Sequence, residues 1–389
     1  MAVTLTNADK ALKTFYLDVI AEQLNTEANP LLGMIKQSTD DVWGKEIRKL
    51  AVYGLNGGIG AGTEEGNLPD STGNNYEQFV LTLKNLYGTI EISDKAVRAS
   101  ENNSGAFVSL LNAEMEGLIK ASGFNFGRML FGDGSGTLAT VTKVEGGAIT
   151  LDSVKNVMEG MLVDFRTTDG VEISGATQRR IIFVDRNKKT VKVSGVTLGE
   201  EIDGAIVTVQ GSFGNEITGL KAIFDETGSL YGLDKASHSW LTPFVKKDAG
   251  EITEEMLQTA LDEIEEKSGS SINFIVCSWG VRRALQKLFA ENKRIIDVTE
   301  LKGGYKAMSY NGIPIVADRF CPDGTLFMLN TLDFTLHQLC DWQWLEGDDG
   351  KVLKQIPGKP VYTATLVKYA DLICARPCGQ GMISGITEA

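Results

Sequence analysis

The sequence predicts an α+β fold, because three stretches of contrasting pattern follow one another along the chain. Residues 105–130 carry one long helical stripe of apolar side chains. Residues 138–209 hold short strand-like runs between turn residues, and the chain beyond residue 215 mixes helices with strands. At 389 residues the chain exceeds the usual single-domain size, so we expect more than one packed unit.

Composition is that of an ordinary globular protein, with 42% hydrophobic and 23% charged residues. No run approaches the roughly 18 apolar residues of a membrane span, and the first ten residues lack the layout of a signal peptide. We therefore expect no membrane partner, folding in the cytosol, and five reduced cysteines. The formal charge of −13 argues against tight clamping of nucleic-acid phosphates, which normally needs a basic surface.

The N-terminal part combines a helix with an unusually long loop. Apolar residues recur at helical spacing from Asn7 to Leu24, and Pro30 closes this segment. Residues 42–53 and 79–92 are two extended legs, joined by residues 54–78, which contain seven glycines and no periodicity. Loops longer than about 12 to 15 residues are uncommon inside a compact domain. We expect this loop to become ordered on a neighbouring molecule.

The strongest helix of the chain is predicted at residues 105–130. Its apolar stripe consists of Phe107, Leu111, Met115, Leu118, Ser122, Phe126 and Met129. Glycines at 117, 123 and 127 each weaken a helix by up to about 1 kcal/mol, so we expect another backbone to pack closely there.

Six short runs then predict a small inserted barrel or sandwich bounded by Gly136 and Gly214. They are residues 138–144, 148–151, 161–165, 180–184, 190–193 and 205–209. Farther along, helices are expected at 253–267 and 281–292. Strands are expected at 272–277, 313–317, 326–329, 334–339 and 363–367.

Motifs with possible chemistry are few. Residues 57–62 are glycine-rich and follow a strand, but neither dinucleotide spacing nor a Gly-Lys-Ser/Thr ending is present, so a docking loop is the better interpretation. The only histidines are His238 and His337, and no serine lies in a Gly-x-Ser-x-Gly motif, which leaves little basis for a hydrolase.

A zinc site could in principle use His337 and Cys340 with Cys374 and Cys378. Positions three apart on a strand point to opposite faces, so we favour buried free cysteines and expect no metal and no cofactor. Two other groups have a simple structural interpretation. Asp262, Glu263, Glu265 and Glu266 form a solvated helix face, and the tryptophans at 342 and 344 share one strand face in a core or subunit contact.

The order of these parts resembles the major capsid proteins of tailed bacteriophages, which have the Hong Kong 97-type fold. Four local runs carry the resemblance: LYGTIEIS at 86–93, NEITGL at 215–220, YNGIPIV at 310–316 and YADLICARP at 369–377. The resemblance covers nearly the whole chain except residues 138–209, which it implies to be an added domain on the outer surface.

The resemblance also implies a division of the chain into named parts. These are an N-terminal arm (1–41), an extended E-loop (42–92), a peripheral domain (93–136, 215–250 and 351–389) with its spine helix at 105–130, an inserted domain (137–214) and an axial domain (251–350). The function implied is a structural one, without catalytic residues: a homo-oligomer of hexamers and pentamers that encloses double-stranded DNA. The expected subunit contacts lie at the loop tip, in Leu55, Gly57, Gly58, Ile59, Gly60, Leu68 and Pro69.

The partners implied are a portal, a separate scaffolding protein and, as a variable feature, a decoration protein. Only about 40 residues precede the first leg, which is short for a built-in scaffold. Packaged DNA would be held without sequence-specific binding, in a virion assembled in the bacterial cytoplasm. Some relatives crosslink a loop lysine to an asparagine, but no lysine here can be given that role. Three alternatives stay open: an encapsulin-type shell, a phage tail or baseplate protein, and a nucleotide-dependent enzyme built on residues 57–62.

Overall fold

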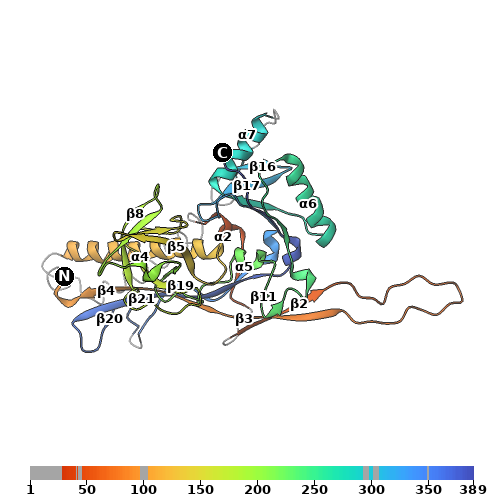
Figure 1. Ribbon diagram of the computed structural model, residues 1–389. Helices are drawn as coiled ribbons and strands as arrows, with labels where there is room; N and C mark the ends of the chain where they lie inside the picture. Colours follow the sequence, from red (N-terminus) through yellow and green to blue (C-terminus); the bar gives the residue numbers. More distant parts are fainter. Residues whose placement is uncertain are drawn as a thin grey trace. The chain divides into compact units, whose positions relative to one another are not determined.

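The chain divides into two compact units, each assembled from three segments (Figure 1). The computed structural model describes residues 29–40, 42, 46–96, 104–291, 298–300, 306–347 and 350–389. The helix predicted at residues 7–24 lies outside them. The first unit comprises Met1–Gly33, Lys84–Ala222 and Cys340–Ala370, and the second comprises Met34–Leu83, Ile223–Leu339 and Asp371–Ala389. Within the described part of the chain, no helix is long and apolar enough to cross a membrane.

The first unit is organised around helix α4 (Ser104–Leu130) and strands β4 (Lys84–Ser93) and β21 (Val361–Cys374). β4 and β21 pair antiparallel over ten residues, from Ser93 opposite Val361 to Lys84 opposite Ala370. Strand β20 (Lys354–Gln355) pairs with the start of β21, and strand β19 (Phe334–Trp344) enters this unit at Cys340.

Helix α4 confirms the predicted helix to within one residue. Of the predicted stripe whose side chains are described, Met115, Ser122, Phe126 and Met129 are buried, and Leu118 is half-buried. The expectation of close packing at Gly117 is wrong, because a Cβ built there would meet no described atom within 4 Å. The close approach occurs at Gly88 of β4, where a Cβ would lie 2.9 Å from the side chain of Leu118.

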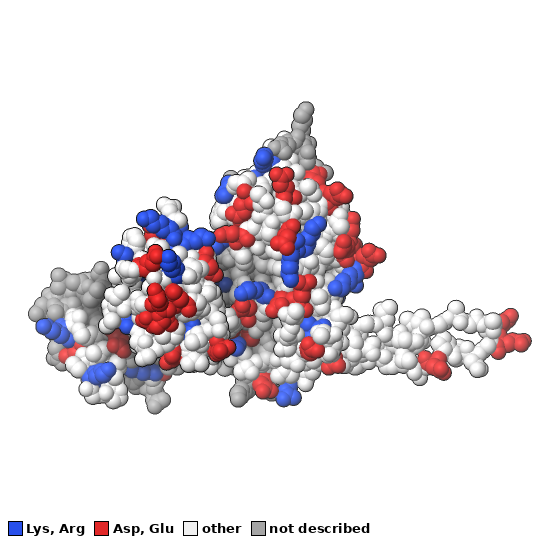
Figure 2. Space-filling view, in the orientation of Figure 1, with Lys and Arg blue, Asp and Glu red and all other residues white. Residues whose placement is uncertain are grey.

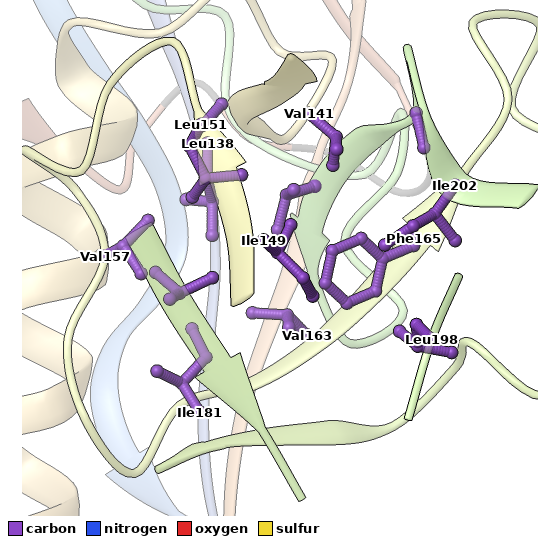
Figure 3. Close-up of a cluster of buried hydrophobic side chains, with 14 of the residues drawn as sticks. Leu138, Val141, Ile149, Leu151, Val157, Val163, Phe165, Ile181, Leu198 and Ile202 are labelled. Atoms are coloured by element: carbon purple, nitrogen blue, oxygen red, sulfur yellow. The ribbon is translucent and has the colours of Figure 1, made fainter. Parts of the chain in front are cut away.

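The predicted inserted domain is a closed antiparallel barrel with the strand order β10-β5-β6-β9-β8-β7. Its strands are β5 (Thr137–Glu145), β6 (Ala148–Leu151), β7 (Leu162–Arg166), β8 (Arg179–Asp185), β9 (Thr190–Val193) and β10 (Ile206–Val209), with a 3₁₀ turn η2 (Glu200–Ile202). The inward residues of each strand form one apolar core, with Val163 and Phe165 at its centre (Figure 3). The alternation of buried and exposed residues explains why all six strands could be predicted from the sequence.

The two ends of the barrel meet. The backbone N–H of Gly214 donates to the carbonyl oxygen of Ser135 over 2.9 Å. Gly136 has a positive φ of 81°, and a Cβ there would lie 2.6 Å from the carbonyl oxygen of Ser212, so only glycine fits. The chain therefore enters and leaves the barrel through one narrow junction.

The second unit contains a seven-stranded sheet in the order β13-β22-β18-β14-β17-β16-β15. The strands are β13 (Phe244–Lys246), β22 (Gly381–Ile383), β18 (Leu326–Leu329), β14 (Phe274–Cys277), β17 (Ile313–Ala317), β16 (Lys306–Tyr310) and β15 (Val298–Glu300). Helices α6 (Glu254–Ser268) and α7 (Trp279–Glu291) both pack on one face of this sheet, against Ile275 and Cys277 of β14. The opposite face buries Phe327 of β18, whose ring lies 5.2 Å from that of Phe224.

Local signals set the ends of α6 where the sequence predicts them. The side chain of Thr253 caps the helix by accepting a hydrogen bond from the N–H of Met256 over 3.1 Å. Gly269 ends it with a φ of 63°, a conformation that favours glycine.

Short elements connect these parts. They are α2 (Pro30–Met34), β1 (Lys36–Ser38), α5 (Leu220–Phe224), β11 (Ser229–Leu230), β12 (Leu233–Asp234), η3 (Ser239–Leu241), η4 (Thr331–Asp333) and η5 (Pro377–Gly379). β1 pairs parallel with β19, with Lys36 opposite Thr335.

The two predicted extended legs have different outcomes. The first is strand β2 (Glu46–Tyr53). The second, predicted at 79–92, consists of two strands: β3 (Asn75–Thr82) pairs with β2, whereas β4 pairs with β21. The prediction of one continuous second leg is therefore wrong, and the long hairpin ends at Thr82.

Candidate subunit-assembly site

The β2–β3 hairpin is two-faced. Its register runs without a bulge from Glu46 opposite Thr82 to Tyr53 opposite Asn75. Alternate residues on the inner face are buried, among them Ile47 and Phe79. The outer face exposes Leu50, Val52 and Tyr76, with Val52 directly opposite Tyr76. The hairpin therefore keeps apolar side chains on both faces, although only one face is covered within the described residues.

Stacked aromatic rings hold the inner face of the hairpin. The ring of Phe79 lies 5.1 Å from that of Tyr231 and 5.7 Å from that of Trp240, and Tyr53 stacks on Trp240 at 5.2 Å. The N–H of Val80 donates to the carbonyl oxygen of Tyr231 over 2.9 Å. Such aromatic pairs each add about 0.5 to 1.5 kcal/mol beyond their burial, so the base of the hairpin is firmly anchored.

The tip of the hairpin, residues 54–74, extends away from this base (Figure 1). Where it begins, the side chain of Asn56 links the two sides of the tip. Its Oδ1 accepts from the N–H of Gly58 over 2.9 Å and from the hydroxyl of Thr72 over 3.0 Å, and its Nδ2 donates to Asn74 Oδ1 over 3.0 Å. A turn that joins Thr63 to Gly66 closes the far end. Hydrogen bonds thus shape the tip, although it has no core of its own.

The predicted contact residues are placed on this tip. Leu55, Ile59 and Leu68 are 88%, 85% and 89% exposed, which is unusual for aliphatic side chains. The glycines at 57, 58 and 60 narrow the tip, and a Cβ at Gly60 would lie 3.1 Å from the ring of Pro69. Burying each aliphatic side chain on a partner would contribute about 1.5 to 3 kcal/mol.

The sequence reasoning missed the outer face of the hairpin. Leu50 and Val52 alternate with half-exposed or buried residues on β2, and Tyr76 lies on the partner strand. The available signal was that β2 carries apolar residues on both of its faces, because Ile47 and Ala51 already fill the inner one. An apolar outer face on a hairpin is typical of an interaction surface.

A phosphate-binding loop is not formed at residues 57–62. No helix begins between residues 54 and 74, all of which the structure describes. A helix N-terminus is what turns glycine-rich backbone into a phosphate site. The phosphate-binding interpretation therefore has no structural support, and the docking loop stays a prediction.

The cysteine and histidine residues weighed for zinc do not form a ligand cluster. Among the described residues, no group of three or more His, Cys, Asp or Glu side chains could hold a metal ion. Burial, which is partial at Cys340 and Cys378, raises the pKa of these two thiols and of Cys374. His337 is buried on β19, three residues before Cys340.

The remaining side chains that were singled out have structural roles. Asp262, Glu263, Glu265 and Glu266 are exposed on α6, as a solvated face requires. The tryptophans at 342 and 344 are both buried. The ring of Trp342 meets that of Phe126 edge to face at 6.2 Å, which places it in the core of the first unit.

The NEITGL run closes the end of α4. Arg128 donates to Glu216 through both of its terminal nitrogens, over 2.9 and 2.5 Å, and both side chains are buried. Gly219 packs on the last carbonyl groups of the helix, where a Cβ would lie 2.3 Å from the oxygen of Met129. This run therefore serves as a structural joint at the end of the long helix.

Comparisons with known proteins agree with this architecture. Residues 215–348 match the family model for the SU10 major capsid protein. The capsid subunit of cyanophage A-1(L) is 12% identical, with 93% of each chain covered and a TM-score of 0.57. The chain has the Hong Kong 97-type capsid fold.

Two further solved structures are similar at a lower level. One is from Mycobacterium phage Bobi, with 8% identity, 94% of this chain and 92% of that chain covered, and a TM-score of 0.48. The other is the holo encapsulin complex from Synechococcus elongatus PCC 7942, with 10% identity, 95% of each chain covered and a TM-score of 0.47. No curated protein sequence matches the chain.

Proposed function

We propose that the chain is a capsid protein, which builds an icosahedral shell of hexamers and pentamers around phage double-stranded DNA and catalyses no reaction. The observation that supports this most directly is the β2–β3 hairpin. Its base is anchored by aromatic stacking, whereas Leu55, Ile59 and Leu68 at its tip are almost fully exposed. An exposed apolar arm of this kind suits a subunit that must hold its neighbours.

In the proposed assembly, the tip lies across an adjacent subunit and buries its aliphatic side chains there. A closed shell repeats the same contact at every subunit, so a modest affinity per contact suffices to hold the lattice. The outer face of the hairpin, with Leu50, Val52 and Tyr76, extends the contact along the arm.

The domain division stays a proposal of the same kind. We assign residues 1–41 to the N-terminal arm, 42–92 to the E-loop, 137–214 to the inserted domain and 251–350 to the axial domain. The peripheral domain takes 93–136, 215–250 and 351–389, and the inserted barrel is placed on the outer surface of the shell.

The charge of the chain fits a container for DNA. With a formal charge of −13, the chain as a whole repels phosphates, so packaged DNA would move during filling without being gripped. We further propose a separate scaffolding protein, a portal and a decoration protein as partners. Assembly would take place in the host bacterial cytoplasm, and the finished product would be the virion.

The test is removal of residues 57–66 from the hairpin tip. Because the cores of both units lie elsewhere, we expect a soluble, folded subunit that no longer closes shells, measured by sedimentation and electron microscopy. A finer variant replaces Leu55, Ile59 and Leu68 with serine. Leu332→Ser is the matched control, because this side chain is 84% exposed but lies outside the hairpin.

Three results would contradict the proposal. Normal shells from the deletion would remove the tip from the assembly mechanism. Tubes or isolated rings from the natural chain would favour a tail or baseplate protein. Particles from infected cells that hold an enzyme instead of DNA would favour an encapsulin-type compartment.

A further inference from the structure

The β8–β9 hairpin of the inserted barrel is strongly basic, although the chain as a whole is acidic. Residues 179–192 contain six basic residues and one acidic residue, a formal charge of +5 in a chain of −13. The basic residues are Arg179, Arg180, Arg186, Lys188, Lys189 and Lys192. Figure 2 shows lysine and arginine side chains gathered over that end of the barrel. Such a local reversal of sign indicates a surface with its own partner.

The hairpin extends past the closed part of the barrel. On one side, β7 pairs with Arg179 and Arg180 of β8, and the segment just before β7 bonds to Ile181 and, through the side chain of Glu159, to the N–H of Val184. On the other side, β9 pairs with β8 as far as Asp185. The far half of β8 is therefore supported by β9 and projects from the barrel (Figure 1).

A β-bulge brings apolar side chains into this basic surface. The register shifts between Ile181, which pairs with Val193, and Phe183, which pairs with Lys192. Ile181 points into the barrel core, and the extra residue Ile182 is 57% exposed beside Phe183, which is 49% exposed. A bulge re-aims side chains, and two adjacent exposed apolar residues are typical of a contact surface.

The six basic side chains of this hairpin fall into two groups of three. Arg179, Arg186 and Lys189 donate to backbone carbonyl oxygens of the barrel. By contrast, within the described part of the chain Arg180, Lys188 and Lys192 are exposed and form no ion pair. We call Arg180, Ile182, Phe183, Lys188 and Lys192 the hairpin patch.

We propose that the hairpin patch docks on the acidic face of helix α6 of a second copy of this chain. The inference rests on the proposed shell, which supplies neighbouring copies. The acidic face of α6 consists of the exposed residues Glu255, Asp262, Glu263, Glu265 and Glu266. Leu261 is half-buried beside them and offers apolar surface to Ile182 and Phe183. Acidic side chains lie over α6 in Figure 2, so the two surfaces are complementary in charge.

DNA fits the hairpin patch less well. Binding of duplex backbone relies on Lys, Arg and polar groups, and the centre of this patch is a pair of apolar side chains. An amphipathic protein surface satisfies both the charges and the apolar residues. Exposed charge pairs are screened over a Debye length of about 10 Å at 0.1 M salt, so the contact should weaken as salt is raised.

The test uses two charge-reversed variants. The hairpin variant carries Arg180→Glu, Lys188→Glu and Lys192→Glu, and the helix variant carries Asp262→Lys, Glu263→Lys and Glu266→Lys. Each alone should reduce particle yield at least tenfold. Combining all six substitutions in one chain should restore most of the yield, because every altered hairpin then meets an altered helix of a neighbouring copy, in pentamers as well as in hexamers.

Two control variants distinguish a defect in folding from a defect in docking. Lys143→Glu reverses an exposed charge on the same barrel outside the patch and should leave the yield unchanged. Ile182→Ser removes apolar surface without charge repulsion and should lower the yield by a smaller factor. Hydrogen exchange of the barrel core in every variant reports whether the barrel is folded.

The outcomes are distinct. Wild-type chain that forms no particles contradicts the proposed shell itself. Wild-type particles together with normal yield from the hairpin variant contradict the docking contact alone. Two defective variants whose combination in one chain does not restore the yield exclude the α6 face as the partner. A mobility shift of duplex DNA by the wild-type subunit that disappears in the hairpin variant would assign the patch to DNA.

Discussion

The buried ion pair between Arg128 and Glu216 gives the sharpest prediction about stability. The side chains are 4% and 3% exposed, and two hydrogen bonds of 2.9 and 2.5 Å join them. Glu216→Gln keeps the shape but removes the negative charge, which leaves the guanidinium of Arg128 buried without a counter-charge. Breaking a buried pair from one side costs about 3 to 5 kcal/mol.

The loss of stability in Glu216→Gln should be confined to the joint at the end of α4. Since each 1.4 kcal/mol corresponds to a factor of ten, amide exchange in this joint should rise about 10²- to 10⁴-fold. Hydrogen exchange with mass spectrometry on peptides from the last turns of α4 and from residues 215–222 measures this directly. A single melting temperature would be less informative, because a two-unit chain need not unfold in one step.

Two further variants separate the charge from the packing. Glu145→Gln removes one partner of the exposed pair with Lys143, where both side chains are more than half exposed, and should change stability by only about 0 to 1 kcal/mol. The double variant Arg128→Met with Glu216→Leu replaces the pair by apolar side chains and should recover most of the loss. Unchanged exchange in Glu216→Gln would show that the pair is solvated and would refute this reasoning.

Three other predictions address single positions. Gly219→Ala should prevent folding of the first unit, because a methyl group there would meet the last carbonyl oxygens of α4. Gly117→Ala should instead stabilise the helix by up to about 1 kcal/mol, because a methyl group there meets no described atom. Soluble yield and urea denaturation compare the two variants. Burial lowers the pKa of Lys368, so the folded chain releases this proton at a lower pH than the unfolded chain does. The free energy of unfolding should therefore rise with pH between the lowered pKa and about 10.4. Lys368→Met should abolish this component of the pH dependence, and an unchanged slope would contradict the prediction. Burial raises the pKa of Cys277 to about 12, so it should resist a thiol reagent at neutral pH in the native protein and react after denaturation.

Much of the fold could be predicted because it is locally encoded. The strands at 148–151 and 190–193 were predicted to the residue, since apolar residues alternate there and turn residues flank each run. Helix α6 is marked by a capping threonine and a terminal glycine. In each of these cases the determining residues lie within a few positions of one another.

The errors occur where the partner lies far away in the sequence. Between Thr82 and Lys84 the chain leaves one hairpin and joins another sheet, yet no glycine or proline interrupts the alternation. The switch depends on β21, nearly three hundred residues later. The same holds for Arg128, whose partner Glu216 is 88 positions away. The local hint of that pair was a charged residue directly before Met129, the last residue of the apolar stripe.

The candidate site was predicted only where its residues are close together in the sequence. The exposed apolar residues of the tip stand out in a glycine-rich loop, so Leu55, Ile59 and Leu68 could be named from the sequence. The basic β8–β9 hairpin was not recognised, because its bulge and its projection depend on the pairing of three strands.

The pairing of β4 with β21 has a consequence for biosynthesis. β4 ends at Ser93, and β21, the only described strand with which it pairs, begins at Val361. At about 5 to 20 residues per second, the ribosome needs roughly 15 to 50 s to cover that interval. Throughout this time the nascent chain carries an unpaired strand edge, while the contiguous barrel can already close. We therefore expect β4 to be protected, by a chaperone or by the ribosome itself, until β21 has been made.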